Sequence, residues 1–238
     1  MVAEVAVDGA EWRQFRCLDH HCYRIDMIQS KDVVLFQGDS ITDCQRDRSR
    51  EAQANAPEAL GLGYARYTGA MILDRWPGVA IYNRGIGGDK VWQLEQRWQV
   101  DCLDLAPDVL SVLIGINDTY HALDDGVGTS LQHYDQVYRQ LLKQAREAKP
   151  SIRLVLCEPF ALRCGQVTEC WFPELDHRRT LVKEIAMDFG AVLVPFQESF
   201  DQALDRAEAA YWAKDGVHPS LAGHMLMARV WMETVGRD

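Results

Sequence analysis

The sequence predicts an α/β domain built around a parallel β-sheet. Five short runs rich in valine, isoleucine and leucine recur along the 238 residues, and segments with helical periodicity lie between them. None of the five runs alternates polar with apolar residues, which is the pattern of strands covered on both faces. Strands and helices in alternation form a parallel sheet with helices on its faces. No internal repeat and no linker-like stretch interrupts this order, so we expect one domain that spans residues 1–238.

The expected strands and helices follow each other along the chain. The strands cover residues 32–37, 79–83, 108–114, 152–157 and 191–196. One helix ends before Pro150 and is indicated by an apolar stripe of Tyr134, Val137, Tyr138, Leu141, Leu142 and Ala145. A second stripe is closed by Gly190 at the expected C-cap and contains Leu181, Val182, Ile185, Ala186 and Phe189. The last helix is expected to begin at Pro219, because proline is tolerated at the first helical position.

Two segments are predicted to be long loops. Residues 44–66 follow the first strand, and residues 163–175 follow the fourth and contain Trp171, Phe172 and Pro173. Long loops inside a compact domain are usually functional or disordered. Both leave the C-terminal ends of strands, where open α/β sheets bind ligands. We therefore expect them at the mouth of a binding site.

The charge of the chain excludes several classes of partner. The 35 acidic residues outnumber the 25 lysines and arginines, which gives a net charge of -10. Such a chain lacks the basic surface that binds nucleic acids or anionic membranes. No run approaches the ~20 apolar residues of a membrane span. We expect a small neutral substrate, no nucleic-acid partner and no membrane partner, and the sequence leaves open a homo-oligomer.

The cysteines and the N-terminus indicate a cytoplasmic location. The seven cysteines are odd in number and unevenly spaced, which favours reduced thiols over a disulfide framework. Residues 1–10 lack the basic residue and the apolar run of a signal peptide. A cluster at residues 17–22, formed by Cys17, His20, His21 and Cys22, resembles half of a zinc site. No second ligand pair follows at a matching spacing, so we expect no metal and no cofactor. The role of residues 1–31 is not indicated.

Four short motifs contain the residues that are candidates for catalysis. Three follow predicted strands directly, at residues 38–43 (GDSITD), 83–89 (NRGIGGD) and 115–118 (GIND). The fourth, at residues 215–219 (DGVHP), precedes the last predicted helix. The C-terminal ends of parallel strands meet at one edge of a sheet, so we expect these motifs to share a pocket.

The residues of these motifs suit nucleophilic catalysis by a serine. The Ser40 hydroxyl needs a base to take its proton, and His218 can be that base. Asp215 lies three residues before His218 and can fix the imidazole tautomer. The oxyanion needs preorganised donors, which the N–H of Ser40, the glycines at 87–88 and the Asn117 amide can supply.

The four motifs, in this order, resemble those of the SGNH (GDSL) hydrolase family. The resemblance runs from about residue 32 to the end of the chain. It implies a flavodoxin-like three-layer α/β/α sandwich with a mainly five-stranded parallel sheet. It also implies Ser40, Asp215 and His218 as the catalytic triad, with Ser40, Gly88 and Asn117 as the oxyanion hole.

Longer matches narrow the resemblance to carbohydrate esterases that remove acetyl groups from xylan-type sugars. They include the segments at residues 38–44, 61–64, 83–89, 97–98, 114–118 and 215–224. Gly87 and Lys90 depart from residues that are frequent in that group, but they leave the catalytic set intact. Candidate substrate-binding residues are Asp39, Trp171, Tyr211 and Trp212. Aromatic faces suit sugar rings, although the aromatic residues could equally form a pocket wall and Asp39 could bond backbone amides.

Two other readings of the motifs fail. A dinucleotide fingerprint would need a third glycine at Lys90 and would have to follow the first strand. The nucleophile elbow of α/β-hydrolases would need a glycine at Thr42. For His224, capping or packing is expected, and Trp76 and Trp231 are expected in the core.

The sequence therefore predicts a cytoplasmic serine esterase that deacetylates small acetylated sugars such as xylo-oligosaccharides. One alternative is a lysophospholipase or thioesterase on the same scaffold. Another is a catalytically silent carbohydrate-binding protein, which the complete triad disfavours. The predicted loops at the mouth are largely polar, which favours a sugar leaving group over a lipid.

Overall fold

Five parallel strands form the central sheet of the protein in the order β2-β1-β3-β4-β5. The computed structural model describes residues 27–124 and 128–236. The strands are β1 (Val33–Gly38), β2 (Ala80–Asn83), β3 (Val109–Leu113), β4 (Arg153–Cys157) and β5 (Val192–Val194). The order is that of flavodoxin-like folds, with the switch point between β1 and β3. The five predicted strands and the fold class are confirmed. The fifth strand is shorter than expected because Pro195, which has no N–H, follows Val194.

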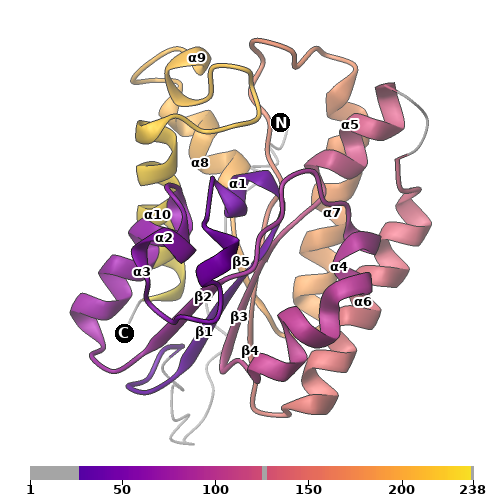
Figure 1. Ribbon diagram of the computed structural model, residues 1–238. Coiled ribbons are helices and arrows are strands. Elements are labelled where there is room, and N and C mark those ends of the chain that lie inside the picture. Colours follow the sequence, from indigo (N-terminus) through magenta and orange to yellow (C-terminus); the bar gives the residue numbers. More distant parts are fainter. Residues whose placement is uncertain (1–26, 125–127, 237–238) are drawn as a thin grey trace, which may run out of the picture.

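Helices cover both faces of the sheet and give three layers (Figure 1). One layer packs α3, α8 and α10 against the sheet, and the other packs α4, α6 and α7. The longer helices are α3 (Tyr64–Arg75), α4 (Val91–Asp101), α5 (Ile116–Asp124), α6 (Leu131–Ala148), α7 (Trp171–Asp188), α8 (Phe196–Ala203) and α10 (Leu221–Val235). The short ones are α1 (Ser40–Asp43), α2 (Pro57–Leu60), α9 (Ala209–Trp212) and the 3₁₀ helices η1 (Arg48–Arg50) and η2 (Leu103–Leu105).

The two hydrophobic cores follow from the sequence pattern of the strands. Successive side chains of a strand point to opposite faces. Phe36 of β1 accordingly packs with Tyr64 and Trp231, while its neighbour Leu35 packs with Trp98 and the α6 stripe. Trp231 is fully buried as predicted, and Trp76 is partly buried against the first core.

Several helix boundaries differ from the prediction. The last helix begins at Leu221, because the Ser220 hydroxyl accepts the N–H of Gly223 and caps it; Pro219 lies outside. The segment 44–66 contains η1 and α2, and α3 begins within it. The segment 163–175 ends in α7, whose first turn includes Pro173. A first-turn residue has no intrahelical partner for its N–H, so proline is accepted there.

Some expectations fall outside the described residues. They include the cluster of Cys17, His20, His21 and Cys22, and most of the segment 1–31. The single domain over residues 1–238 therefore stays a prediction. Within residues 27–124 and 128–236, no helix is long and apolar enough to cross a membrane. The same residues contain no group of three or more His, Cys, Asp or Glu side chains that could hold a metal ion.

Candidate active site

Ser40, His218 and Asp215 lie in one hydrogen-bonded line. Ser40 Oγ is 2.9 Å from His218 Nε2, and His218 Nδ1 is 2.7 Å from Asp215 Oδ2. A carboxylate only accepts hydrogen bonds, so Nδ1 carries the proton of the neutral imidazole and Nε2 accepts from the serine hydroxyl. The arrangement can therefore move a proton from Ser40 to His218. The side chains of His218 and Asp215 are 52% and 42% exposed, so both groups meet solvent.

The turn between β1 and α1 sets the position of Ser40. A side chain at Gly38 would overlap the carbonyl oxygen of Leu113, so β1 ends on glycine. Asp39 caps α1, and its Oδ1 accepts the N–H of Ile41 at 3.0 Å. The Asp39 side chain is buried, and its Oδ2 has no hydrogen-bond partner among the described residues. Burial raises the pKa of Asp39 to about 7, against the lowering effect of the Ile41 N–H.

The loop that bears His218 is closed by Asp215 itself. Asp215 Oδ1 accepts the N–H groups of Val217 at 2.9 Å and His218 at 2.7 Å. Gly216 adopts a left-handed φ of 86°, and a side chain there would approach the carbonyl oxygens of Cys164 and Leu162 too closely. Burial raises the pKa of Asp215, but the hydrogen bonds from the His218 side chain and the two amides outweigh it. The net pKa lies below the usual value, which favours the carboxylate form.

Gly88 lies in the loop after β2, and Asn117 lies in the first turn of α5. Gly88 has a left-handed φ of 86°, and the space that a side chain there would fill is open. Within the described residues, the N–H of Gly88 and that of Ser40 donate to no protein group. Asn117 Nδ2 donates to the Asp89 carbonyl at 3.0 Å, which fixes the orientation of the amide. The amide has two N–H groups, so one stays available.

A hollow of about 340 Å³ opens beside Ser40 and His218. Its wall is formed by Ser40, Ile41, Asp43, Cys44, Gln45, His218, Pro219 and His224. A larger hollow of about 450 Å³ lies between α8 and α10, and its wall has no serine–histidine pair. Chemistry, rather than size, therefore identifies the candidate active site.

Of the candidate substrate-binding residues, none belongs to the wall of the 340 Å³ hollow. Trp171 is buried in the first turn of α7, 5.5 Å from the ring of Tyr120. Trp212 is also buried, and its indole N–H donates to the carbonyls of Ala203 and Ala207. Tyr211, in contrast, is 55% exposed, and Asp39 is buried. A role in substrate binding stays a prediction for all four residues.

His224 lines the hollow but does not join the line of Ser40, His218 and Asp215. Its Nδ1 accepts the N–H of Tyr64 at 3.2 Å, and its Nε2 lies 3.3 Å from Cys44 Sγ. Burial, followed by the nearby His218, lowers the pKa of His224 to about 4, so the ring is neutral near pH 7. His224 is buried and accepts the first N–H of α3, which agrees with the capping or packing expected for it.

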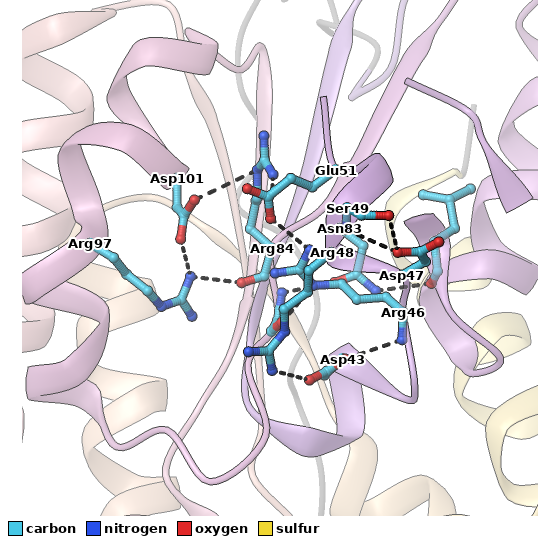
Figure 2. A network of polar contacts seen from close by, with 12 residues as sticks. Asp43, Arg46, Asp47, Arg48, Ser49, Glu51, Asn83, Arg84, Arg97 and Asp101 are labelled. Atoms are coloured by element: carbon cyan, nitrogen blue, oxygen red, sulfur yellow. Dashed lines mark hydrogen bonds and ion pairs between the residues drawn. The ribbon is translucent and has the colours of Figure 1, made fainter. Parts of the chain in front are cut away.

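The sequence did not predict a network of arginines and carboxylates that contacts residues 84–89, called the Gly88 loop here (Figure 2). Arg97 donates from Nε to Asp89 Oδ2 at 2.8 Å and from NH1 to the Arg84 carbonyl at 2.7 Å. Arg46, which is buried, donates from Nε to the Gly85 carbonyl at 2.7 Å. The only sequence signal was the clustering of arginines after the first motif, which gave no partner.

The fold and the serine–histidine–aspartate line are those of a serine hydrolase with a parallel α/β/α core. The sequence matches the GDSL-like Lipase/Acylhydrolase family over residues 36–226, which is most of the chain. The protein belongs to this family and is a serine esterase.

Relatives and solved structures that are similar to this chain agree with the assignment to this family. The chain is 34% identical over 213 residues to an acetylxylan esterase of Geobacillus stearothermophilus, covering 88% of this chain and 96% of that protein. The crystal structure of Axe2, an acetylxylan esterase from the same organism, superposes with a TM-score of 0.81 at 32% identity, covering 89% of this chain and 97% of that one. A protein of Parabacteroides merdae described as a GDSL-like lipase superposes with a TM-score of 0.84 at 46% identity, covering 89% and 99%.

Structures of catalytic mutants of Axe2 are also similar to this chain. In them a serine, a histidine or an aspartate is replaced by alanine. The aspartate precedes the histidine by the same number of residues as Asp215 precedes His218.

Proposed function

We propose that the protein removes acetyl groups from small acetylated sugars, such as xylo-oligosaccharides, with Ser40 as nucleophile, His218 as base and Asp215 as its partner. The observation that carries the proposal is the line from Ser40 Oγ through His218 to Asp215 Oδ2, with bonds of 2.9 and 2.7 Å. The acetylxylan esterase relatives support the choice of an acetylated sugar as substrate.

In the first half-reaction Ser40 Oγ attacks the acetyl carbonyl carbon while His218 Nε2 takes the hydroxyl proton. Asp215 stabilises the resulting imidazolium through Nδ1. The carbonyl oxygen becomes an oxyanion, for which we propose the N–H groups of Ser40 and Gly88 and the free N–H of Asn117 as donors. Donors that are already in place stabilise the transition state without reorganising.

The tetrahedral intermediate collapses when the bond between the carbonyl carbon and the sugar oxygen breaks. His218 Nε2 gives its proton to that oxygen, which leaves an acetyl group on Ser40. In the second half-reaction His218 removes a proton from water, and the hydroxide attacks the acetyl-serine. Acetate leaves and the proton returns to Ser40.

The position of the hollow suits a sugar leaving group. The leaving oxygen must reach His218 Nε2, so the leaving group belongs on the side where His218 and Pro219 line the hollow. The wall there combines Asp43, Gln45 and two histidines with Ile41 and Pro219. A mixed wall of this kind can hydrogen-bond hydroxyl groups and pack against the apolar face of a ring.

A series of nitrophenyl esters followed by acetylated sugars tests the proposal. We expect kcat/KM to fall from acetate through butyrate to octanoate, and acetate to be released from acetylated xylo-oligosaccharides. The Ser40→Ala variant is the control for non-enzymatic hydrolysis. A lipid-handling enzyme would show the reverse trend, since each buried methylene contributes ~0.8 kcal/mol. Higher kcat/KM on octanoate, with no acetate released from the sugar, would overturn the substrate assignment.

A further inference from the structure

The loop of residues 84–89 is fixed at almost every peptide group. The N–H of Gly85 donates to Asn83 Oδ1 at 2.9 Å, and the N–H of Ile86 donates to the Gly38 carbonyl at 3.0 Å. The carbonyls of Arg84, Gly85 and Asp89 accept from the side chains of Arg97, Arg46 and Asn117. Among the described residues the Gly88 N–H is the exception in this loop, since no protein acceptor faces it.

Asp43 connects this loop to the helix that carries the nucleophile. It is the last residue of α1, and its Oδ2 accepts the N–H of Gly87 at 3.0 Å. Its Oδ1 accepts the N–H of Arg46 at 3.2 Å, which orients the carboxylate. The Gly88 N–H belongs to the peptide group between Gly87 and Gly88, which comes directly after the Gly87 N–H that Asp43 holds. One carboxylate on α1 therefore fixes the backbone that determines where the Gly88 N–H points.

A carboxylate at this position carries an electrostatic cost. Asp43 lines the hollow beside Ser40, so its negative charge opposes an oxyanion that forms there. Arg48 supplies the opposite charge, because its NH2 donates to Asp43 Oδ2 at 2.8 Å (Figure 2). The Arg48 side chain is 52% exposed, and within the described residues Asp43 is its one ion-pair partner.

We propose that Asp43 and Arg48 are positioning residues for the oxyanion. Asp43 holds the Gly87 amide so that the Gly88 N–H faces the reacting carbonyl, and Arg48 balances the charge of that carboxylate. This assignment rests on the proposed function, because it needs an oxyanion beside Ser40. Neither residue touches the acetyl group or its oxyanion in this account.

The first test replaces Asp43 and measures kcat and KM separately on 4-nitrophenyl acetate. We expect Asp43→Ala to lower kcat by about 10- to 100-fold, the scale of a small misplacement at an active site. Asp43→Asn should lower kcat less, because its amide oxygen can still accept the Gly87 N–H. KM should change little, because the donor acts on the transition state. The matched control is Glu58→Ala, which removes an exposed carboxylate from another arginine of η1, Arg50. It should leave kcat unchanged.

The second test uses the arginines of η1, which are an internally matched pair. The side chains of Arg48 and Arg50 are 52% and 41% exposed, and each pairs with a single carboxylate among the described residues. We expect Arg48→Ala to lower kcat about two- to fivefold, the range of an exposed ion pair. Arg50→Ala should lower it by less. In the Asp43→Asn background, where the charge is already absent, Arg48→Ala should have no further effect on kcat.

Folding is checked for each variant by urea unfolding and by fluorophosphonate labelling of Ser40. If Asp43→Ala folds and keeps the kcat of the wild type, Asp43 does not position the amide and the proposal is wrong. The proposal is also wrong if Arg48→Ala lowers kcat by the same factor in the wild type and in the Asp43→Asn background. If the Asp43 variants do not fold, the Arg48 and Arg50 variants decide: equal kcat values for the two contradict the proposal. Wild-type protein that fails to hydrolyse 4-nitrophenyl acetate would instead contradict the proposed function.

Discussion

The acid–base side of the candidate site and the side that carries Gly88 and Asn117 differ in how they are held. His218 and Asp215 are about half exposed and lie on a loop before α10, where Asp215 Oδ1 accepts the loop's own amides. The Gly88 loop is packed against α1, α4 and α5 and is bonded to several of their side chains. Proton transfer needs groups that exchange protons with substrate and water, whereas stabilisation of an oxyanion needs donors already in place. The half-exposed His218 and Asp215 suit proton exchange, and the Gly88 loop, held by side chains of three helices, suits fixed donors.

The largest effect is expected on the acid–base side, from His218→Ala. Without a base, Ser40 keeps its proton, and kcat should fall on the order of 10⁶, as for a lost triad histidine. The measurement is kcat on 4-nitrophenyl acetate, with the exposed His133→Ala as control. A loss of less than about a hundredfold, well short of that expectation, would mean that another group acts as base.

The second prediction for the acid–base side concerns the Asp215→Asn variant. The amide presents N–H groups or a neutral oxygen to Nδ1, so the imidazole loses the partner that fixes its tautomer and stabilises its cation. We expect kcat to fall on the order of 10⁴ with KM nearly unchanged. A variant whose defect lies mainly in KM would place Asp215 in substrate binding instead.

On the oxyanion side, Asn117→Ala should cost less. Removing one donor typically lowers kcat by about 10²–10³, because the remaining donors still act. Asn117 also donates to the Asp89 carbonyl, so urea unfolding should accompany the kinetics to separate lost catalysis from lost structure. An Asn117→Ala variant with wild-type kcat and wild-type stability would remove Asn117 from the oxyanion hole.

The smallest effect on activity, but a clear one on stability, is expected from His224. Its pKa is about 4 in the folded protein and near 6.5 when exposed, so the unfolded chain binds the proton more readily. The free energy of unfolding should therefore fall as the pH drops from about 6.5 to 4, by about 3 kcal/mol in total. The contribution of neutral His224 to the free energy of unfolding is fully present above the pKa of the histidine in the unfolded chain.

His224→Asn removes the titration and can still accept the N–H of Tyr64 through its side-chain oxygen. Urea unfolding at pH 7 and pH 5 should show a smaller loss of stability for this variant than for the wild type. His133→Asn, at an exposed position, should behave like the wild type. Equal pH dependence in the wild type and His224→Asn would mean that His224 is protonated freely in the folded protein.

The sequence was informative where function depends on local pattern. Buried strands, the motifs at their ends and the pairing of Asp215 with His218 all lie within short stretches, so residue types and spacing predict them. The positions of Trp171 and Trp212 could not be predicted in this way. Both look like exposed loop aromatics, yet one begins α7 and the other bonds the carbonyls of Ala203 and Ala207.

The polar network behind the Gly88 loop was also beyond sequence reasoning. Asp43 meets the Gly87 amide, and Arg46 meets the Gly85 carbonyl, across about forty residues of chain, since the contacts are 44 and 39 residues apart. Nothing in the spacing of these residues indicates which peptide they will reach. Only the folded arrangement of α1 beside the loop after β2 supplies that information.

The most direct test of the central claim is to locate the reactive serine. The purified protein is treated with a fluorophosphonate, digested and analysed by mass spectrometry, with Ser40→Ala in parallel. We expect one adduct, on Ser40, whose formation abolishes acetyl ester hydrolysis, and neither labelling nor hydrolysis in Ser40→Ala. An adduct on another residue, or hydrolysis that persists in a folded Ser40→Ala variant, would contradict the account.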